Sequence, residues 1–247
     1  MRKSLWLPLA LAVLLILLIA GAQVGLRRHD LALLLIHSLE LLAPLLWVPI
    51  GIAAIFVWRR TGEAAAGYYA LAMAPHAVAM LFYAIALLPG QTQLHLVRYM
   101  LLPLQPIGLA LAALAWAKEP RGLPRRALTI LTAATAAGHY LYLFTFSLHG
   151  ATQGALGTIQ LIQTAYWAVL VAVAWNGYRR EPRQALLWMS LLALCLGLHS
   201  LTGTISLLLP MAASFFSMPL YYILTLLALI AAGGVLYNAA RQPNSSN

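Results

Sequence analysis

The sequence predicts an all-α integral membrane protein with eight transmembrane helices and both termini in the cytoplasm. Three observations predict this fold class. The chain of 247 residues is 63% hydrophobic and only 8% charged, a balance that no soluble domain of this length needs. Its apolar residues form repeated runs of about 20 residues, the length that crosses a bilayer core of about 30 Å as a helix. Its basic residues fall in the short breaks between these runs, mostly on one side.

We expect one polytopic membrane domain over 1–247. The breaks between its helices carry charges or turn residues, as in Arg179-Arg180-Glu181-Pro182, with a last break over Pro210 to Ser214. Prolines within the spans are tolerated as kinks and help to shape cavities; they are Pro44, Pro49, Pro75, Pro103 and Pro106. The expected helices are 4–24, 31–58, 65–88, 95–117, 125–147, 155–177, 184–209 and 214–238.

The first run, 4–24, has two interpretations. Arg2-Lys3, the apolar run and Ala20-Gly21-Ala22-Gln23 also have the pattern of a cleaved signal peptide. The run is long for a signal peptide, which favours a retained helix. Cleavage would leave seven spans and would not move the others.

The distribution of Lys and Arg sets the expected orientation. With the N-terminus inside, twelve of the 15 basic residues lie on the cytoplasmic side, and only Arg27, Arg28 and Arg98 lie on the other. The net charge of +10 is therefore a topology signal, and no nucleic-acid partner is expected. The cytoplasmic set is Arg2, Lys3, Arg59, Arg60, Lys118, Arg121, Arg125, Arg126, Arg179, Arg180, Arg183 and Arg241.

The second helix, 31–58, carries Glu40, the one acidic residue inside any expected span. An ionisable group at this depth costs about 2.5–3.5 kcal/mol, so we expect it to be functional and to have a partner. His37 lies one turn earlier on the same helical face. Arg98, near the outer start of the fourth helix, is the one cation placed to meet Glu40. A purely structural buried pair is an equal alternative.

Four histidines from four helices share one depth with Glu40, in a slab about 10–15 Å thick in the outer half of the membrane. They are His37, His76, His139 and His199. On the third helix, Met73, His76 and Met80 follow at spacings of three and four and form one stripe. Each histidine could simply hydrogen-bond a neighbouring helix, and the methionines could simply pack.

This cluster predicts a site for a transition metal (Cu, Zn or Fe) or for haem b. Imidazole suits all three metals, thioethers add a preference for Cu(I), and two facing histidines would hold haem. No CxxCH, HExxH or paired-cysteine motif is present, and Cys195, the single cysteine, is expected to pack within a span. The candidate metal ligands are His37, Glu40, His76, His139, His199, Met73 and Met80, and Arg98 joins the histidines and Glu40 in the expected ligand-binding set.

Three short motifs lie between His37 and Arg98: His37-Ser38-Leu39-Glu40, the stretch from Tyr69 to His76, and Gln91-Thr92-Gln93-Leu94 leading to Arg98-Tyr99. This segment, about a quarter of the chain, resembles the third class of bacterial membrane-associated sensor domains, the multi-helix input modules of histidine kinases and diguanylate cyclases. The chain departs from that pattern at Met73-Ala74-Pro75, where the family has an acidic residue. It also shows no output domain after the last helix.

The resemblance implies a sensory module in a bacterial inner membrane that signals through a separate cytoplasmic partner. Two other function classes stay open. One is a membrane-embedded metal- or haem-dependent enzyme, with Glu40 or a histidine as general base. The other is a transporter of protons or small solutes, although the cytoplasmic halves of the helices carry no charge to continue a path. The sequence leaves the ligand open, and also whether the chain forms a homodimer in the lipid bilayer.

Overall fold

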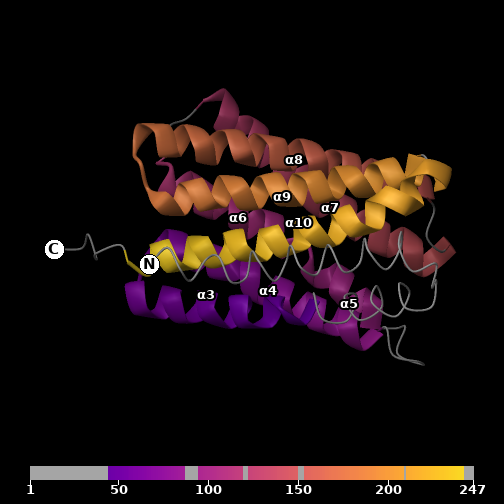
Figure 1. The fold of residues 1–247 in the computed structure, drawn as a ribbon, viewed down its shortest axis with the longest axis horizontal. Coiled ribbons are helices and arrows are strands. Elements are labelled where there is room, and N and C mark those ends of the chain that lie inside the picture. Colours follow the sequence, from indigo (N-terminus) through magenta and orange to yellow (C-terminus); the bar gives the residue numbers. More distant parts are fainter. Residues whose placement is uncertain (1–43, 87–93, 119–121, 150–152, 209, 242–247) are drawn as a thin grey trace, which may run out of the picture.

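The structure is a computed structural model that describes residues 44–86, 94–118, 122–149, 153–208 and 210–241 (Figure 1). Within these ranges the chain is all-helical, which confirms the predicted fold class at this level. The helices are α3 (Trp47–Thr61), α4 (Ala64–Ala86), α5 (Leu94–Leu101), α6 (Leu104–Trp116), α7 (Leu123–His149), α8 (Gln153–Arg180), α9 (Gln184–Leu208) and α10 (Pro210–Ala239).

Six stretches of the described chain are long and apolar enough to cross a membrane, and the protein is a multi-pass membrane protein. The expected helix at 4–24, and the part of the second expected helix before residue 44, lie outside the described residues. The six stretches are Ala64–Ala86, Val97–Trp116, Leu123–Phe144, Gly157–Arg180, Gln184–Ile205 and Tyr222–Ala239.

The helices pack side by side into a closed ring. Along the chain, α3 packs on α4, α4 on α6, and then α6 to α10 each pack on the next helix. The ring closes because α10 also contacts α3. Figure 1 shows these helices lying nearly parallel to the long axis of the molecule. Each of these ring helices therefore has a neighbour on both sides.

Small residues allow close approach between neighbours in the ring. Gly108 of α6 faces the backbone of α4 so closely that a Cβ at this position would lie 2.6 Å from the Tyr68 carbonyl oxygen and the Ala72 nitrogen. In a bilayer, where lipid tails are as apolar as side chains, such close packing is a main source of helix association. The α4–α6 interface therefore depends on a residue without a side chain at 108.

A hydrophobic core fills one end of the ring. Its largest fully buried side chains include Trp116 at the end of α6, Leu128 near the start of α7 and Leu186 near the start of α9. Tyr69 of α4 is buried there too, and its hydroxyl donates a hydrogen bond to the Ala232 carbonyl of α10 at 3.1 Å. This bond joins α4 to α10, the two helices that flank α3 in the ring.

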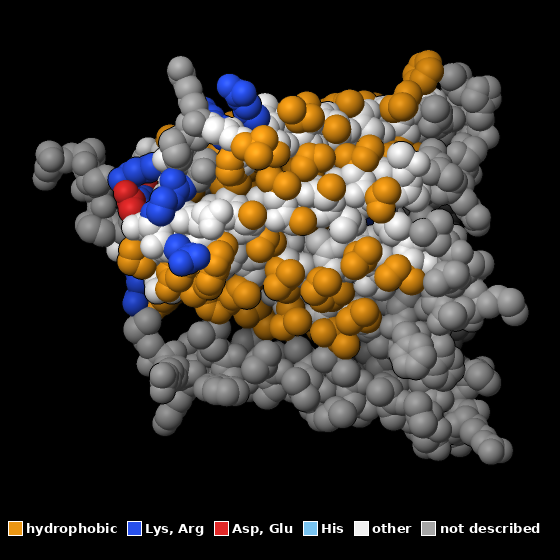
Figure 2. All heavy atoms as spheres, turned by 90° about the horizontal axis from the view of Figure 1, so that it is seen from above, with side chains coloured by type: hydrophobic (Ala, Val, Ile, Leu, Met, Phe, Trp, Pro, Cys, Tyr) orange, Lys and Arg blue, Asp and Glu red, His pale blue; other side chains and the backbone are white. Residues whose placement is uncertain are grey.

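The same end carries the charges. In the part of the chain that the structure describes, every Lys and Arg except Arg98 lies at or beside a helix end on this side. Figure 2 shows basic side chains gathered at one end of the bundle and hydrophobic side chains spread along the rest of the visible face. Large side chains such as Phe56, Ile130 and Phe144 are more than 60% exposed, as expected for a lipid-facing surface.

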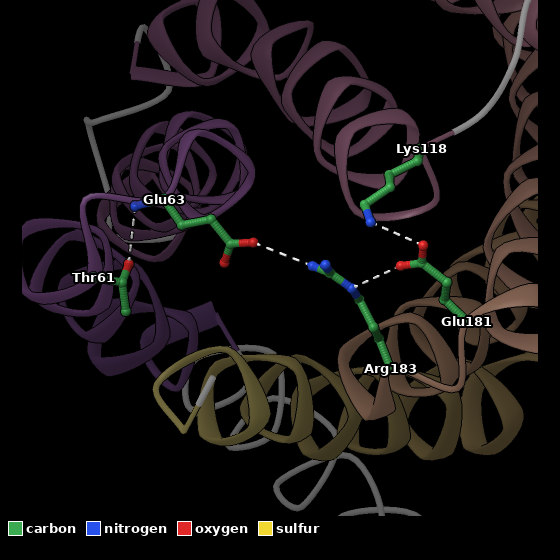
Figure 3. Close-up of polar contacts among 5 residues, drawn as sticks. All are labelled: Thr61, Glu63, Lys118, Glu181 and Arg183. Carbon is green, nitrogen blue, oxygen red and sulfur yellow. Dashed lines mark hydrogen bonds and ion pairs between the residues drawn. The ribbon is translucent and has the colours of Figure 1, made fainter. Parts of the chain in front are cut away.

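An ionic cluster joins three connections at this end (Figure 3). Arg183, before α9, lies 3.5 Å from Glu63, before α4, and 3.4 Å from Glu181. Glu181 also accepts a hydrogen bond from the Lys118 ammonium, after α6, at 2.8 Å. The Lys118 hydrogen bond, with Arg183 adding to it, holds the pKa of the Glu181 carboxyl below its usual value.

The structure differs from the expected helices in two places, although Val97–Trp116 is one spanning stretch. The helix expected at 95–117 is broken between α5 and α6, because Pro103 and Pro106 both lack the N–H that a continuous helix needs. The Gln105 N–H bonds instead to the Leu102 carbonyl, three residues back, at 3.2 Å. The break expected over Pro210 to Ser214 is absent: α10 begins at Pro210, a residue tolerated in the first turn of a helix.

Candidate functional site

A cavity of about 270 Å³ lies in the half of the ring away from the charged end. Every described helix contributes to its wall, which combines aromatic rings with amide, hydroxyl and imidazole groups. Most pockets for small molecules join an apolar wall to a few polar groups in this way. The closed ring therefore encloses a site of the general kind that binds a small ligand.

The cavity collects five of the eight candidate residues. His76, His139 and His199, from three different helices, line it together with Met80 and Arg98. Met73 does not line it: it is 1% exposed and belongs to the hydrophobic core. His37 and Glu40 lie outside the described residues.

His139 has both ring nitrogens engaged. Its Nδ1 lies 2.8 Å from the Thr135 carbonyl oxygen, and its Nε2 lies 2.8 Å from the Gln163 amide nitrogen. A carbonyl only accepts, so Nδ1 carries the proton and Nε2 accepts from Gln163. The ring is therefore neutral in this arrangement, and the lone pair that a metal would need is already used.

The other two histidines have different surroundings. His199 Nδ1 lies 3.4 Å from the Thr225 hydroxyl, at the long end for a hydrogen bond. His76 packs edge-on against Trp47, with ring centroids 4.8 Å apart at an interplanar angle of 90°. Its Nδ1 is buried without a hydrogen-bond partner. Of the three imidazoles, His76 thus has a ring nitrogen that lacks a hydrogen-bond partner among the described residues.

Arg98 supplies the one permanent charge on the described part of the cavity wall. Its guanidinium carbon lies 4.2 Å from the centre of the Tyr83 ring and 5.7 Å from that of Tyr99, so both contacts are cation–π interactions. His76, His139 and His199 line the same cavity as Arg98. Arg98 and the three histidines therefore belong to one site.

Unpartnered polar atoms concentrate on this wall. Of six buried side-chain nitrogens and oxygens that lack a hydrogen-bond partner in the described part of the chain, five belong to residues lining the cavity. Each unsatisfied buried group costs about 1–3 kcal/mol, and folded proteins carry only a few. The five atoms are His76 Nδ1, Arg98 Nε, Gln105 Nε2, Thr135 Oγ1 and Gln160 Oε1.

Sequence reasoning missed Gln105, Thr135 and most of the aromatic wall. Gln105 carried a usable signal, because it is an amide in an apolar run between Leu104 and Pro106. Thr135 carried none, since threonine within a membrane helix commonly bonds its own backbone. Tyr166 shows how the wall is held: its hydroxyl donates to the Pro106 carbonyl at 2.7 Å, across from α8 to α6.

Metal binding receives no direct support from this arrangement. In the described ranges, no three His, Cys, Asp or Glu side chains come together in a way that could hold a metal ion. A metal here would need His76, His199 and a further ligand from elsewhere. A porphyrin is larger than a cavity of about 270 Å³, so haem would require the ring to widen.

Comparison with known proteins adds no relative: no family model, curated protein or solved structure matches the chain. The resemblance of residues 37–98 to bacterial membrane sensor domains therefore stays a prediction. The class that fold and site define is a multi-pass helical membrane protein with a polar, aromatic cavity inside its ring of helices.

Proposed function

We propose that this protein is a sensory, ligand-binding module of the bacterial inner membrane, and that its ligand occupies the cavity. One observation carries the proposal: of the six buried side-chain polar atoms without partners in the described part of the chain, five belong to residues that line one cavity. Unsatisfied groups at this density fit a binding site better than a packing core.

We extend the proposal to the topology. Eight spans with both termini in the cytoplasm account for the nine described basic residues gathered at one end, which becomes the cytoplasmic end. The cavity then lies in the outer half of the membrane. A ligand would reach it from outside the cell or from the outer leaflet.

The ring of helices can couple the cavity to the cytoplasmic end of the protein. Because every described helix contributes to the cavity wall, a ligand that fits one arrangement of the ring better than another shifts the population toward it. The ionic cluster of Glu63, Lys118, Glu181 and Arg183 joins three connections at the far end and would report such a shift. A separate cytoplasmic protein would read it there, and a kinase or cyclase gene beside this one would support the proposal.

The test is thermal unfolding of the detergent-purified protein against a collection of small molecules. A ligand at one hundred times its Kd adds about 2.7 kcal/mol, which raises the Tm of a chain this size by about 5–10 °C. Ser200→Phe, which fills the cavity from α9, should abolish the rise. Val78→Phe on the outer face of α4, 43% exposed, is the matched control and should keep it. A rise that persists in Ser200→Phe, or no rise with any compound, contradicts the proposal.

A metal or haem centre is the second candidate, favoured by the imidazoles of His76 and His199, which line the same cavity. Its test is an absorbance spectrum with elemental analysis on protein purified without chelator. A Soret band, or near-stoichiometric Cu, Fe or Zn that falls in His76→Ala and His199→Ala, would establish it. A colourless, metal-free protein would leave the organic ligand as the surviving candidate.

A further inference from the structure

The cavity wall has an unbalanced charge within the described residues. Arg98 lines it, and no described Asp or Glu does. An uncompensated charge inside a membrane protein is expensive, so intramembrane cations pair with anions or mark ligand sites. The charge on this wall therefore favours an anionic ligand and opposes a metal cation.

Arg98 lies against an aromatic ring and has one hydrogen-bond donor without a partner. Its guanidinium carbon lies 4.2 Å from the centre of the Tyr83 ring, which is a cation–π contact. The Nε of Arg98 is buried and lacks a partner among the described residues. A carboxylate matches the fork of N–H groups that a guanidinium presents.

A second donor on the wall points to the same chemistry. Gln105 is only 7% exposed, and its amide nitrogen, which can only donate, has no partner. His76 is 6% exposed, and its unpartnered Nδ1 can also donate in one tautomer. Buried donors without acceptors are what a ligand rich in acceptor oxygens would satisfy.

The rest of the wall favours a flat apolar body. Six aromatic side chains from six helices line the cavity, and aromatic rings pair favourably with other rings in edge-on or offset contacts. A cavity of about 270 Å³ lies at the small end of the usual range for ligand pockets, about 300–1,000 Å³, and therefore suits a ligand with one ring and one head group. The aromatic residues are Trp47, Tyr83, Tyr99, Tyr142, Trp167 and Tyr222.

We infer that the ligand is a small aromatic carboxylate whose anionic head group binds Arg98 and whose ring lies against the aromatic wall. This inference rests on the proposed function, because it names the ligand class of the same cavity. An inorganic anion would leave the aromatic wall without a contact, and a neutral ring would leave Arg98 without one.

The experiment compares matched acids and amides on the full chain in mild detergent. Benzoate and 4-hydroxybenzoate are ionised at pH 7, whereas benzamide and 4-hydroxybenzamide have nearly the same shape and no charge. Apparent Kd values come from the dependence of Tm on ligand concentration. Each acid is expected to bind at least tenfold more tightly than its amide, and cyclohexanecarboxylate, which is charged but not flat, should bind more weakly than benzoate.

Variants then assign the charge preference to Arg98. Arg98→Gln should remove the difference between acid and amide, and Arg98→Lys should keep part of it. Arg126→Gln, an exposed cationic position at the other end of the ring, is the matched control and should change neither Kd. If Arg98→Gln does not fold, the acid-to-amide ratio of the unmodified protein still decides the question.

The possible outcomes separate a failure of this inference from a failure of the proposed function. Equal affinity for acids and amides overturns the inference, and that is the result expected if Arg98 serves Glu40 instead of a ligand. Binding of cyclohexanecarboxylate as tight as that of benzoate overturns the aromatic part. If other compounds raise the Tm and none of these acids does, the inference fails and the proposed function stands. If no compound of any class raises it, the proposed function fails as well.

Discussion

The close contact at Gly108 gives a prediction that needs no knowledge of the ligand. Alanine at this position places a Cβ 2.6 Å from two backbone atoms of α4, which cannot rotate away as a side-chain end could. Overpacking of this kind costs about 1–3 kcal/mol, and alanine recovers somewhat under 1 kcal/mol through its better helix propensity. The expected net loss is therefore up to about 2 kcal/mol, which is a fall in Tm of up to about 8 °C.

Gly157→Ala is the matched control for Gly108→Ala. Gly157 also lies within a helix, α8, but a Cβ there would meet nothing within 4 Å. It should leave the Tm unchanged or raise it slightly. The assay is thermal unfolding followed with a fluorogenic thiol reagent, because Cys195 is the single cysteine and is half-buried in the folded chain.

Equal shifts in the two glycine variants would refute the packing argument. Gly108→Ala should also weaken ligand binding. Gly108 lies three residues after Gln105 on α6, so any displacement of α6 moves the cavity wall. A Gly108→Ala variant with lowered Tm and unchanged affinity would show that the wall does not depend on this interface.

Three further predictions concern single interactions. Tyr69→Phe removes a buried hydrogen bond to α10 and should cost about 0.6–1.5 kcal/mol in unfolding free energy; a cost of zero would mean that the bond is not made. The hydrogen bond from Lys118 lowers the folded-state pKa of Glu181, so its contribution is present above the unfolded value of 4.5 and is lost as pH falls through the lowered value. Unfolding measured between neutral pH and pH about 3 should show this loss, and Glu181→Gln should remove that part of the pH dependence. If Glu40 pairs with Arg98, Glu40→Gln should destabilise the protein and Arg98→Leu should rescue part of the loss, whereas additive losses would speak against the pair.

The sequence was most informative about spans and depth. Apolar runs of membrane length located the six spanning stretches, because a bilayer imposes the same length on each. Helical rise alone placed His76, His139 and His199 at one depth, and all three line the cavity. Depth gives the position of a residue only along the membrane normal, however. Which residues meet depends also on the order of the helices around the ring.

Met73 shows where periodicity failed. It shares a helical face with His76 and Met80, as expected from spacings of three and four. At 1.5 Å per residue, however, Met73 lies about 10 Å closer to the charged end than Met80 does. The cavity does not extend to that level of α4. The hydrogen bond between Gln163 and His139 also could not be predicted from the sequence, because it joins side chains whose helices meet only in the folded ring.

The interruption at Leu102 and Pro103 separates two mechanical roles within one membrane crossing. On the side of the charged end, α6 packs closely on α4 at Gly108, where the backbones of the two helices approach each other. On the other side, the short α5 carries Arg98 and is joined to α6 where two prolines remove backbone hydrogen bonds, so bending is less costly there than elsewhere in the crossing. Arg98, the permanent charge of the site, thus lies on a short helix next to a position where the crossing bends most readily. A ligand that binds Arg98 can reorient α5 while α6 keeps its packing against α4.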